Sequence, residues 1–216
     1  MGLTVAEIVR LNADLDAYNI ISNWTRDYLA QPHSNLGRPG PVCPFTPEAL
    51  LRDTLHIKVV RFVSDPSREI EQAVIAAQQA FMDLEPAGEG AIYKAILLVF
   101  PDVALADAPV LIDATKERLK PSFVNSGLML GEFHESNVGP GLHNDQFQPL
   151  RSPIPMLVIR FMVSSDLVFL NRESDPPAAR ALFLNAYLKH QVLRPGDRAK
   201  VEKILADARK ASAVSA

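Results

Sequence analysis

The fold is decided by residues 127–163, GLMLGEFHESNVGPGLHNDQFQPLRSPIPMLVIRFMV, in which a polar loop separates two apolar segments of strand length. The segments 128–134 and 156–163 are strongly apolar and short, so both are predicted to be strands of a buried sheet. The whole stretch holds two of the five histidines, His134 at the end of the first segment and His143 in the loop, together with several acids and a Pro-flanked Arg-Ser pair. The functional site is therefore expected to form around this loop.

The other segments predict helices and strands that follow one another along the chain. Apolar residues recur every three or four positions over 4–28 and over 65–84, where Asp65 and a following proline form a good helix start. Residues 55–63 have alternating apolar positions and residues 91–100 are almost continuously apolar, which predicts two more strands. Further helices are expected at three places: 106–119 with an end near Lys120-Pro121, 178–191 and 196–211. The residues after Asp166 are expected to be irregular.

These elements predict an α+β fold: a mixed sheet of four or more strands with helices mainly on one face, and helical N-terminal and C-terminal extensions. A chain of 216 residues is long for one domain and short for two, so a single domain is expected over 1–216. Its expected parts are an N-terminal helix (1–30), a Pro-rich crossing (31–54), the sheet core (55–170) and C-terminal helices (171–216). The apolar residues 42–45 favour an ordered crossing over a solvated linker.

Composition and charge narrow the expected partners. The net charge of −3 gives no electrostatic footprint for nucleic acid or an anionic membrane. No apolar run reaches the roughly 18 to 20 residues of a membrane span, and the first residues do not resemble a signal peptide, so a cytoplasmic location is expected. The single cysteine, Cys43, excludes an internal disulfide and a multi-cysteine metal site. A small-molecule substrate is the expected partner, and the amphipathic terminal helices suggest a homodimer.

Two arginines are candidates for binding an anion. Arg160 lies inside an apolar predicted strand, and a buried guanidinium needs an acidic or hydrogen-bonding partner. That partner is either Glu132 on a neighbouring strand, an acid on a covering helix, or the carboxylate of a ligand. Arg151 lies in the extended segment PLRSP, where it either binds an anion or is solvated.

Histidine and cysteine provide the other candidates. His134 ends a predicted strand, and His143 lies in the loop with Glu135 and Asp145 nearby. Two histidines and a carboxylate could form a metal site, although a histidine that is merely hydrogen-bonded in the loop is the simpler interpretation. Cys43 is a nucleophile, a soft metal or haem ligand, or a small buried apolar residue.

Four segments resemble a family of bacterial proteins that has no assigned activity and often occurs beside biosynthetic genes: VCPFTPEAL (42–50), GLMLGEFHE (127–135), LHNDQFQPLRSP (142–153) and MLVIRFMVSSDLVFL (156–170). The resemblance extends over roughly 24–170. More remotely, a Cys-Pro-Phe element, a strand that ends in Phe-His and a later Arg-Ser segment are similar in order to the YqcI/YcgG family. Members of that family include haem-dependent enzymes that hydroxylate nitrogen in guanidino or amino groups.

The remote resemblance implies a haem pocket and an oxidoreductase activity. His134, on the matching Phe-His, would be the axial ligand of the haem iron. Cys43 and Phe45 would line the pocket, while Arg151 and Arg160 would meet the propionates or the substrate. We therefore expect a haem-dependent oxygenase-like enzyme that acts on the nitrogen of a small amine or amino-acid-derived metabolite.

Two alternatives stay open. One is a non-haem metal enzyme that uses His134, His143 and the carboxylate of Glu135 or Asp145. The other is a non-catalytic protein that binds an anionic metabolite or a pathway partner through its arginines.

Overall fold

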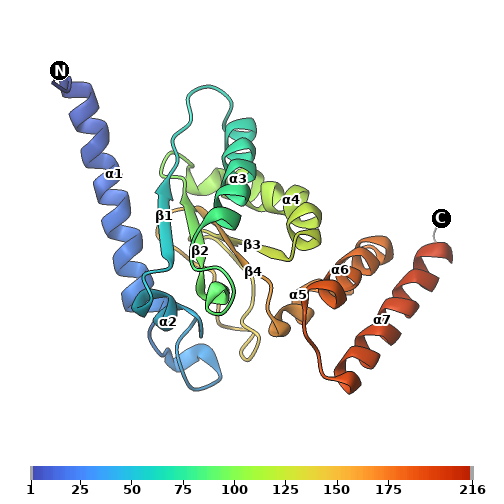
Figure 1. The fold of residues 1–216 in the computed structure, drawn as a ribbon. Helices are drawn as coiled ribbons and strands as arrows, with labels where there is room; N and C mark the ends of the chain where they lie inside the picture. The colour runs from blue at the N-terminus through green and yellow to red at the C-terminus, as the bar shows by residue number, and fades with distance from the viewer. Residues whose placement is uncertain (1, 215–216) are drawn as a thin grey trace. The chain divides into compact units, whose positions relative to one another are not determined.

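The structure is a computed structural model and describes residues 2–214. Helices and strands follow one another along the chain (Figure 1). The strands are β1 (Leu55–Val59), β2 (Ala95–Val99), β3 (Leu128–Phe133) and β4 (Met156–Phe161). The α-helices are α1 (Val5–Trp24), α2 (Thr46–Leu51), α3 (Pro66–Asp83), α4 (Ala114–Asn125), α5 (Leu167–Leu170), α6 (Pro177–His190) and α7 (Pro195–Val214). In this range no helix is both long and apolar enough to cross a membrane.

The four strands form one mixed sheet with the order β1-β2-β4-β3. β1 and β2 are parallel, with Leu55 opposite Ala95 and Val59 opposite Val99. The start of β4 adjoins the end of β2, and the end of β4 adjoins the start of β3, so β4 runs antiparallel to both. The carboxyl ends of β1, β2 and β3 consequently lie at the same edge of the sheet. The predicted α+β class and the mixed four-stranded sheet are confirmed.

The chain forms two compact units. One consists of the chain up to Lys116 together with Gly131–Ile159, and the other of Glu117–Leu130 together with the chain from Arg160 onward.

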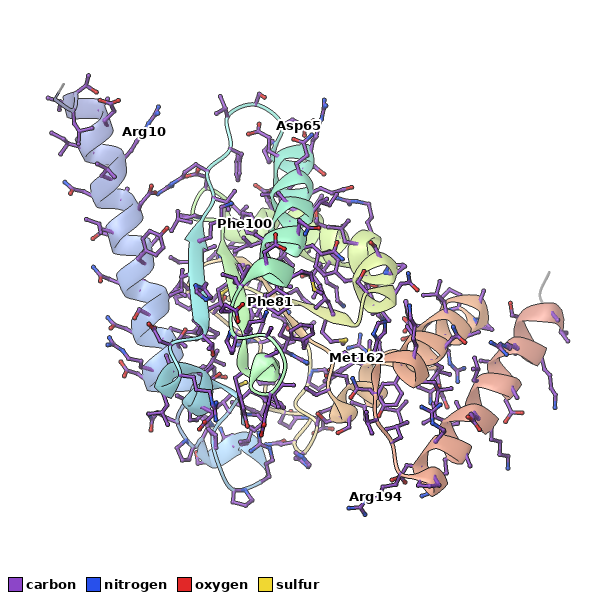
Figure 2. The ribbon with its side chains drawn as sticks, viewed as in Figure 1. Arg10, Asp65, Phe81, Phe100, Met162 and Arg194 are labelled. Carbon is purple, nitrogen blue, oxygen red and sulfur yellow. The ribbon has the colours of Figure 1, made fainter. Side chains whose placement is uncertain are left out.

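The core of the first unit lies on both faces of β2. Leu97 and Val99 pack with Ile21 of α1. Because side chains alternate along a strand, the intervening Leu98 points to the opposite face. α3 contacts β2 and buries one stripe of apolar residues that includes Phe81. Figure 2 labels this residue and Phe100, which follows β2 and is also fully buried.

α1 lies along β1, as Figure 1 shows. The helix begins at the predicted segment because Thr4 and Glu7 form a capping box. The hydroxyl of Tyr18 accepts a hydrogen bond from the backbone N–H of Val59, which fixes the helix at the end of the strand. The first turns of α1 expose apolar side chains, and the homodimer stays a prediction.

The Pro-rich crossing is an ordered segment, as its apolar residues suggested. Leu36 and Val42 are buried against Phe147 of the polar loop. A single antiparallel bridge between Pro32 and Pro41 closes the segment.

Two predictions about helices were wrong. The helix that was expected to end near Lys120-Pro121 continues to Asn125 with Pro121 inside it. Phe123 and Val124 are almost completely buried beyond the proline, and this burial offsets the helix-breaking cost of Pro121. The segment after Asp166 was expected to be irregular, but the short helix α5 forms there.

The second unit has its own apolar core. α6 and α7 lie side by side in Figure 1, and Arg194, labelled in Figure 2, lies in the connection between them. The core consists mainly of side chains from these two helices and α5: Leu170, Phe183, Leu184, Tyr187, Val201 and Leu205.

Candidate functional site

His134 follows β3 directly and is the most buried histidine beside the polar loop, with 1% of the residue exposed. Both of its ring nitrogens have partners. Nε2 lies 3.0 Å from Oδ1 of Asp113, and Nδ1 lies 3.0 Å from Oγ of Ser136. We call these three residues the Asp113–His134–Ser136 relay.

The chemistry of the partners fixes the roles of the two nitrogens. An ionised carboxylate only accepts hydrogen bonds, so His134 Nε2 donates to Asp113. In the neutral ring the other nitrogen then has a lone pair, so Nδ1 accepts from the hydroxyl of Ser136. The imidazole is therefore oriented as a base toward this hydroxyl.

The backbone explains how the relay forms. Asp113 ends the π-helix η5 (Pro109–Asp113), which continues directly into α4, and its side chain is 39% exposed. Ser136 is exposed in a tight turn, which is closed by a 3.0 Å hydrogen bond from the N–H of Asn137 to the carbonyl of His134. The relay thus runs from an exposed hydroxyl through a buried ring to a partly exposed carboxylate.

A second polar pair lies beside the relay. Lys116 Nζ is 3.3 Å from Glu132 Oε1, with side chains 7% and 19% exposed. Glu132 and His134 are two residues apart and share one face of the strand, while Asp113 and Lys116 are three apart on the helical segment. β3 and the start of α4 therefore meet through paired polar groups, which keeps buried charge compensated.

Arg151 lies next to the turn that carries Ser136. Its Nε donates to the carbonyl of Asn137 over 3.2 Å, and Arg151 as a whole is exposed. Burial raises the pKa of Tyr28, and the positive charge of Arg151 opposes that rise. The Tyr28 hydroxyl donates to the carbonyl of Pro149 over 3.4 Å.

Tyr28 belongs to a series of aromatic rings that we call the aromatic row: Trp24, Tyr28, His33 and Phe147. The ring centroids of Trp24 and Tyr28 are 5.6 Å apart, and those of His33 and Phe147 are 4.6 Å apart with nearly parallel planes. Tyr28 meets His33 edge to face at 6.1 Å. Tyr28 itself lies in the π-helix η1 (Thr25–Leu29), which extends α1. Single π-helical turns are frequent at functional sites.

Cys43 and Phe45 lie in separate apolar surroundings. Cys43 is partly buried, packs against the cluster of Leu29, Leu36, Val42 and Phe147, and donates its N–H to Leu29. Phe45 packs against the ring of Tyr93 at 6.3 Å. Both contacts agree with packing roles for these side chains.

Arg160 is paired within the protein, but not with Glu132. Its two terminal nitrogens lie 2.7 and 2.6 Å from the two carboxylate oxygens of Asp166, in the 3-10 turn η6 (Ser164–Asp166). The Asp166 carboxylate also accepts from the N–H of Val163. Glu132 instead pairs with Lys116. Of the partners considered for Arg160, neither Glu132 nor a ligand carboxylate is found, and the guanidinium holds the carboxylate of Asp166.

The metal site suggested by the loop is not assembled. Across residues 2–214, no three His, Cys, Asp or Glu side chains are grouped so as to hold a metal ion. His143, Glu135 and Asp145 are exposed in the loop, whereas His134 is buried with its own partners.

A haem, which the resemblance implies, needs an imidazole nitrogen for its iron. Both nitrogens of His134 are engaged by protein oxygens. Arg160, expected at the propionates, is engaged by Asp166. These residues, as the structure arranges them, do not fit a haem.

Sequence reasoning found His134 and Arg151 but missed Asp113, Lys116 and Ser136. Asp113 and Lys116 lay within a predicted helix, and their spacing of three placed them on one helix face. Their spacing of three is the one feature of the sequence that relates these two residues, because a π-helical turn has no distinguishing sequence pattern. Ser136 was a loop residue without a distinguishing pattern.

The fold and the site together define an α+β protein with a buried histidine relay beside the carboxyl edge of its sheet. Comparison with family models matches residues 18–200 to a family described as a domain of unknown function, DUF6875. The match covers most of the chain, and the chain belongs to this family. Neither the curated proteins nor the solved structures include a match.

Proposed function

We propose that this protein is an enzyme in which the Ser136 hydroxyl is the nucleophile and His134 is its general base. The supporting observation is the position of the His134 ring: Nδ1 lies 3.0 Å from Ser136 Oγ, and Nε2 lies 3.0 Å from Asp113 Oδ1. A neutral ring that donates from Nε2 to the carboxylate accepts from the Ser136 hydroxyl at Nδ1. A nucleophile within hydrogen-bond reach of a base, which a third group orients, is the arrangement of serine-dependent acyl chemistry. The proposed reaction is hydrolysis of an ester or amide bond.

Each residue has a defined role in this reaction. Ser136 Oγ attacks the carbonyl carbon as its proton moves to His134 Nδ1. The resulting imidazolium is stabilised by the adjacent Asp113 carboxylate. The proton then passes to the departing alcohol or amine, and water hydrolyses the acyl-serine by the same route. The exposed position of Ser136 supports access of substrate and water.

This proposal differs from the haem-dependent N-oxygenase that the resemblance implies. In that enzyme a ring nitrogen of His134 would have to be free to bind the haem iron, and the relay uses both ring nitrogens. A cytoplasmic location is part of the proposal, because the single cysteine suits a reducing compartment.

A fluorophosphonate probe, which bonds covalently to activated serines, tests the proposal without knowledge of the substrate. We expect labelling of Ser136, located by peptide mass spectrometry and absent in Ser136→Ala. His134→Gln should slow the labelling by roughly 10²-fold to 10⁴-fold, as expected for loss of a general base. Asp113→Asn should also slow it, and this partly exposed position is less sensitive to folding defects.

His143→Gln is the matched control, because His143 is exposed in the same loop and lies outside the relay. Circular dichroism would verify that every variant is folded. Failure to label Ser136 in the folded wild type, or equal labelling of wild type and His134→Gln, would overturn the proposal.

A further inference from the structure

Arg151 is bound to the turn that carries the proposed nucleophile. Its Nε is fixed to the carbonyl of Asn137, the residue that follows Ser136. The guanidinium lies on an exposed residue, and no acidic group from residues 2–214 lies within ion-pair distance of it. Arg151 thus differs from Arg160, whose terminal nitrogens hold a buried carboxylate.

The anchoring of Nε determines what Arg151 can bind. With Nε used by the backbone, the two terminal nitrogens remain as parallel donors. Two such donors match the two oxygens of a carboxylate, and this geometry is stronger and more selective than a single charged contact.

The aromatic row provides a second feature of the same surface. Trp24 and Tyr28 are both half-buried, so part of each ring remains accessible. The Tyr28 hydroxyl donates to the carbonyl of Pro149, two residues before Arg151, so the backbone contact brings Tyr28 to the segment that carries the cation. A cation next to accessible aromatic surface suits a ligand with a negative group on an apolar body.

We propose that Arg151 forms a carboxylate-binding subsite, which selects substrates that carry a free carboxylate beside an aromatic or apolar body. This inference rests on the proposed function, because it supplies the substrate class for the Ser136 reaction. In this complex the terminal nitrogens of Arg151 hold the carboxylate, Tyr28 contacts the apolar body, and the bond to be cleaved faces Ser136.

Benzoate is the simplest probe of the subsite, and benzamide is its neutral counterpart. Titration calorimetry or NMR should detect benzoate binding to the wild-type protein and at least about tenfold weaker binding of benzamide. Arg151→Gln, which keeps donor groups and removes the charge, should weaken benzoate binding by about tenfold or more. Arg151→Lys should recover only part of the affinity because it lacks the fork.

Arg10→Gln is the matched control, since Arg10 is an exposed arginine near the start of α1 (Figure 2). Benzoate affinity should be the same in this variant and in the wild type. Equal binding of benzoate and benzamide, or no loss of affinity in Arg151→Gln, would overturn the subsite.

Protection from the fluorophosphonate separates the two proposals. Saturating benzoate should slow the labelling of Ser136 in the wild type, and benzamide at the same concentration should not. Benzoate binding that needs Arg151, without any labelling of Ser136, would overturn the proposed reaction and leave the subsite standing. Labelling of Ser136 that bound benzoate does not slow would overturn the position of the subsite beside the nucleophile.

Discussion

Replacement of Arg160 by methionine should destabilise the protein, because it strips a buried carboxylate of its partner. Asp166 is 1% exposed, and both of its oxygens accept from Arg160. Removing one member of a buried ion pair costs about 3–5 kcal/mol. The Arg160 side chain is 30% exposed, so water weakens the ion pair. We therefore expect a loss at the lower end of this range, about 3 kcal/mol.

The neutral background of Asp166→Asn tests the physical cause. An asparagine can still accept from the N–H of Val163 through its amide oxygen, and it leaves no uncompensated charge. In this background the Arg160→Met change should cost less than about 1 kcal/mol, which gives a coupling energy of about 2 kcal/mol.

Urea unfolding followed by circular dichroism at 222 nm would measure all four members of this cycle. For a chain of this size, a loss of about 3 kcal/mol corresponds to a fall in melting temperature of about 6–12 °C. A cost below about 0.5 kcal/mol for Arg160→Met, or an equal cost in both backgrounds, would refute the structural role of the pair. It would also reopen Arg160 as a ligand-binding residue.

Other groups give predictions of different kinds. The Thr25 hydroxyl is buried and has no hydrogen-bond partner within residues 2–214, so Thr25→Val should raise the free energy of unfolding by about 1 kcal/mol; a loss of stability would contradict this. Backbone hydrogen bonds from Asp65, Ser64 and Val63 lower the pKa of Glu69 to about 2. The stability that these hydrogen bonds give the folded protein should be complete above the ordinary glutamate pKa near 4.5 and be lost toward pH 2, and acid titration of Glu69→Gln should lack this component. Burial lowers the pKa of Lys94, so stability should rise with pH up to about 10.5, and denaturation of Lys94→Met should not show that rise. When haemin is added, the visible spectra of the wild type and of His134→Ala should be the same. A sharp Soret band in the wild type that is lost in His134→Ala would restore the haem hypothesis.

Local patterns in the sequence were sufficient for most of the fold. Asp65 and Pro66 predicted the start of α3 correctly, because helix capping depends only on residues close in sequence. The Asp65 side chain accepts a hydrogen bond from the backbone N–H of Arg68, as an N-cap residue does. The apolar run at 91–100 contains β2, although its first residues form a 3-10 turn. Pro121 was misread because the burial that carries α4 past it is a tertiary effect.

The site was less predictable for the same physical reason. His134 was identified because a polar residue at the end of an apolar strand stands out in the sequence. Its partner Asp113 precedes it by 21 residues and is brought close by a π-helical turn. The partner of Arg160 is only six residues away, yet the 3-10 turn that presents Asp166 lies between the predicted strand 156–163 and the segment expected to be irregular, where no element was predicted. Local pattern therefore located His134 and Arg160 without identifying the oxygens that bind them.

The position of β4 has a consequence for synthesis of the chain on the ribosome. β1, α3 and β2 are contiguous and can associate early, whereas the strand that separates β2 from β3 is translated last. Until residues 156–161 emerge, one edge of β2 presents unpaired backbone groups beside almost completely buried side chains. Such an edge pairs readily with other chains. Nascent or truncated chains that end before Met156 should consequently be the aggregation-prone species of this protein, and the complete chain is protected by its own late strand.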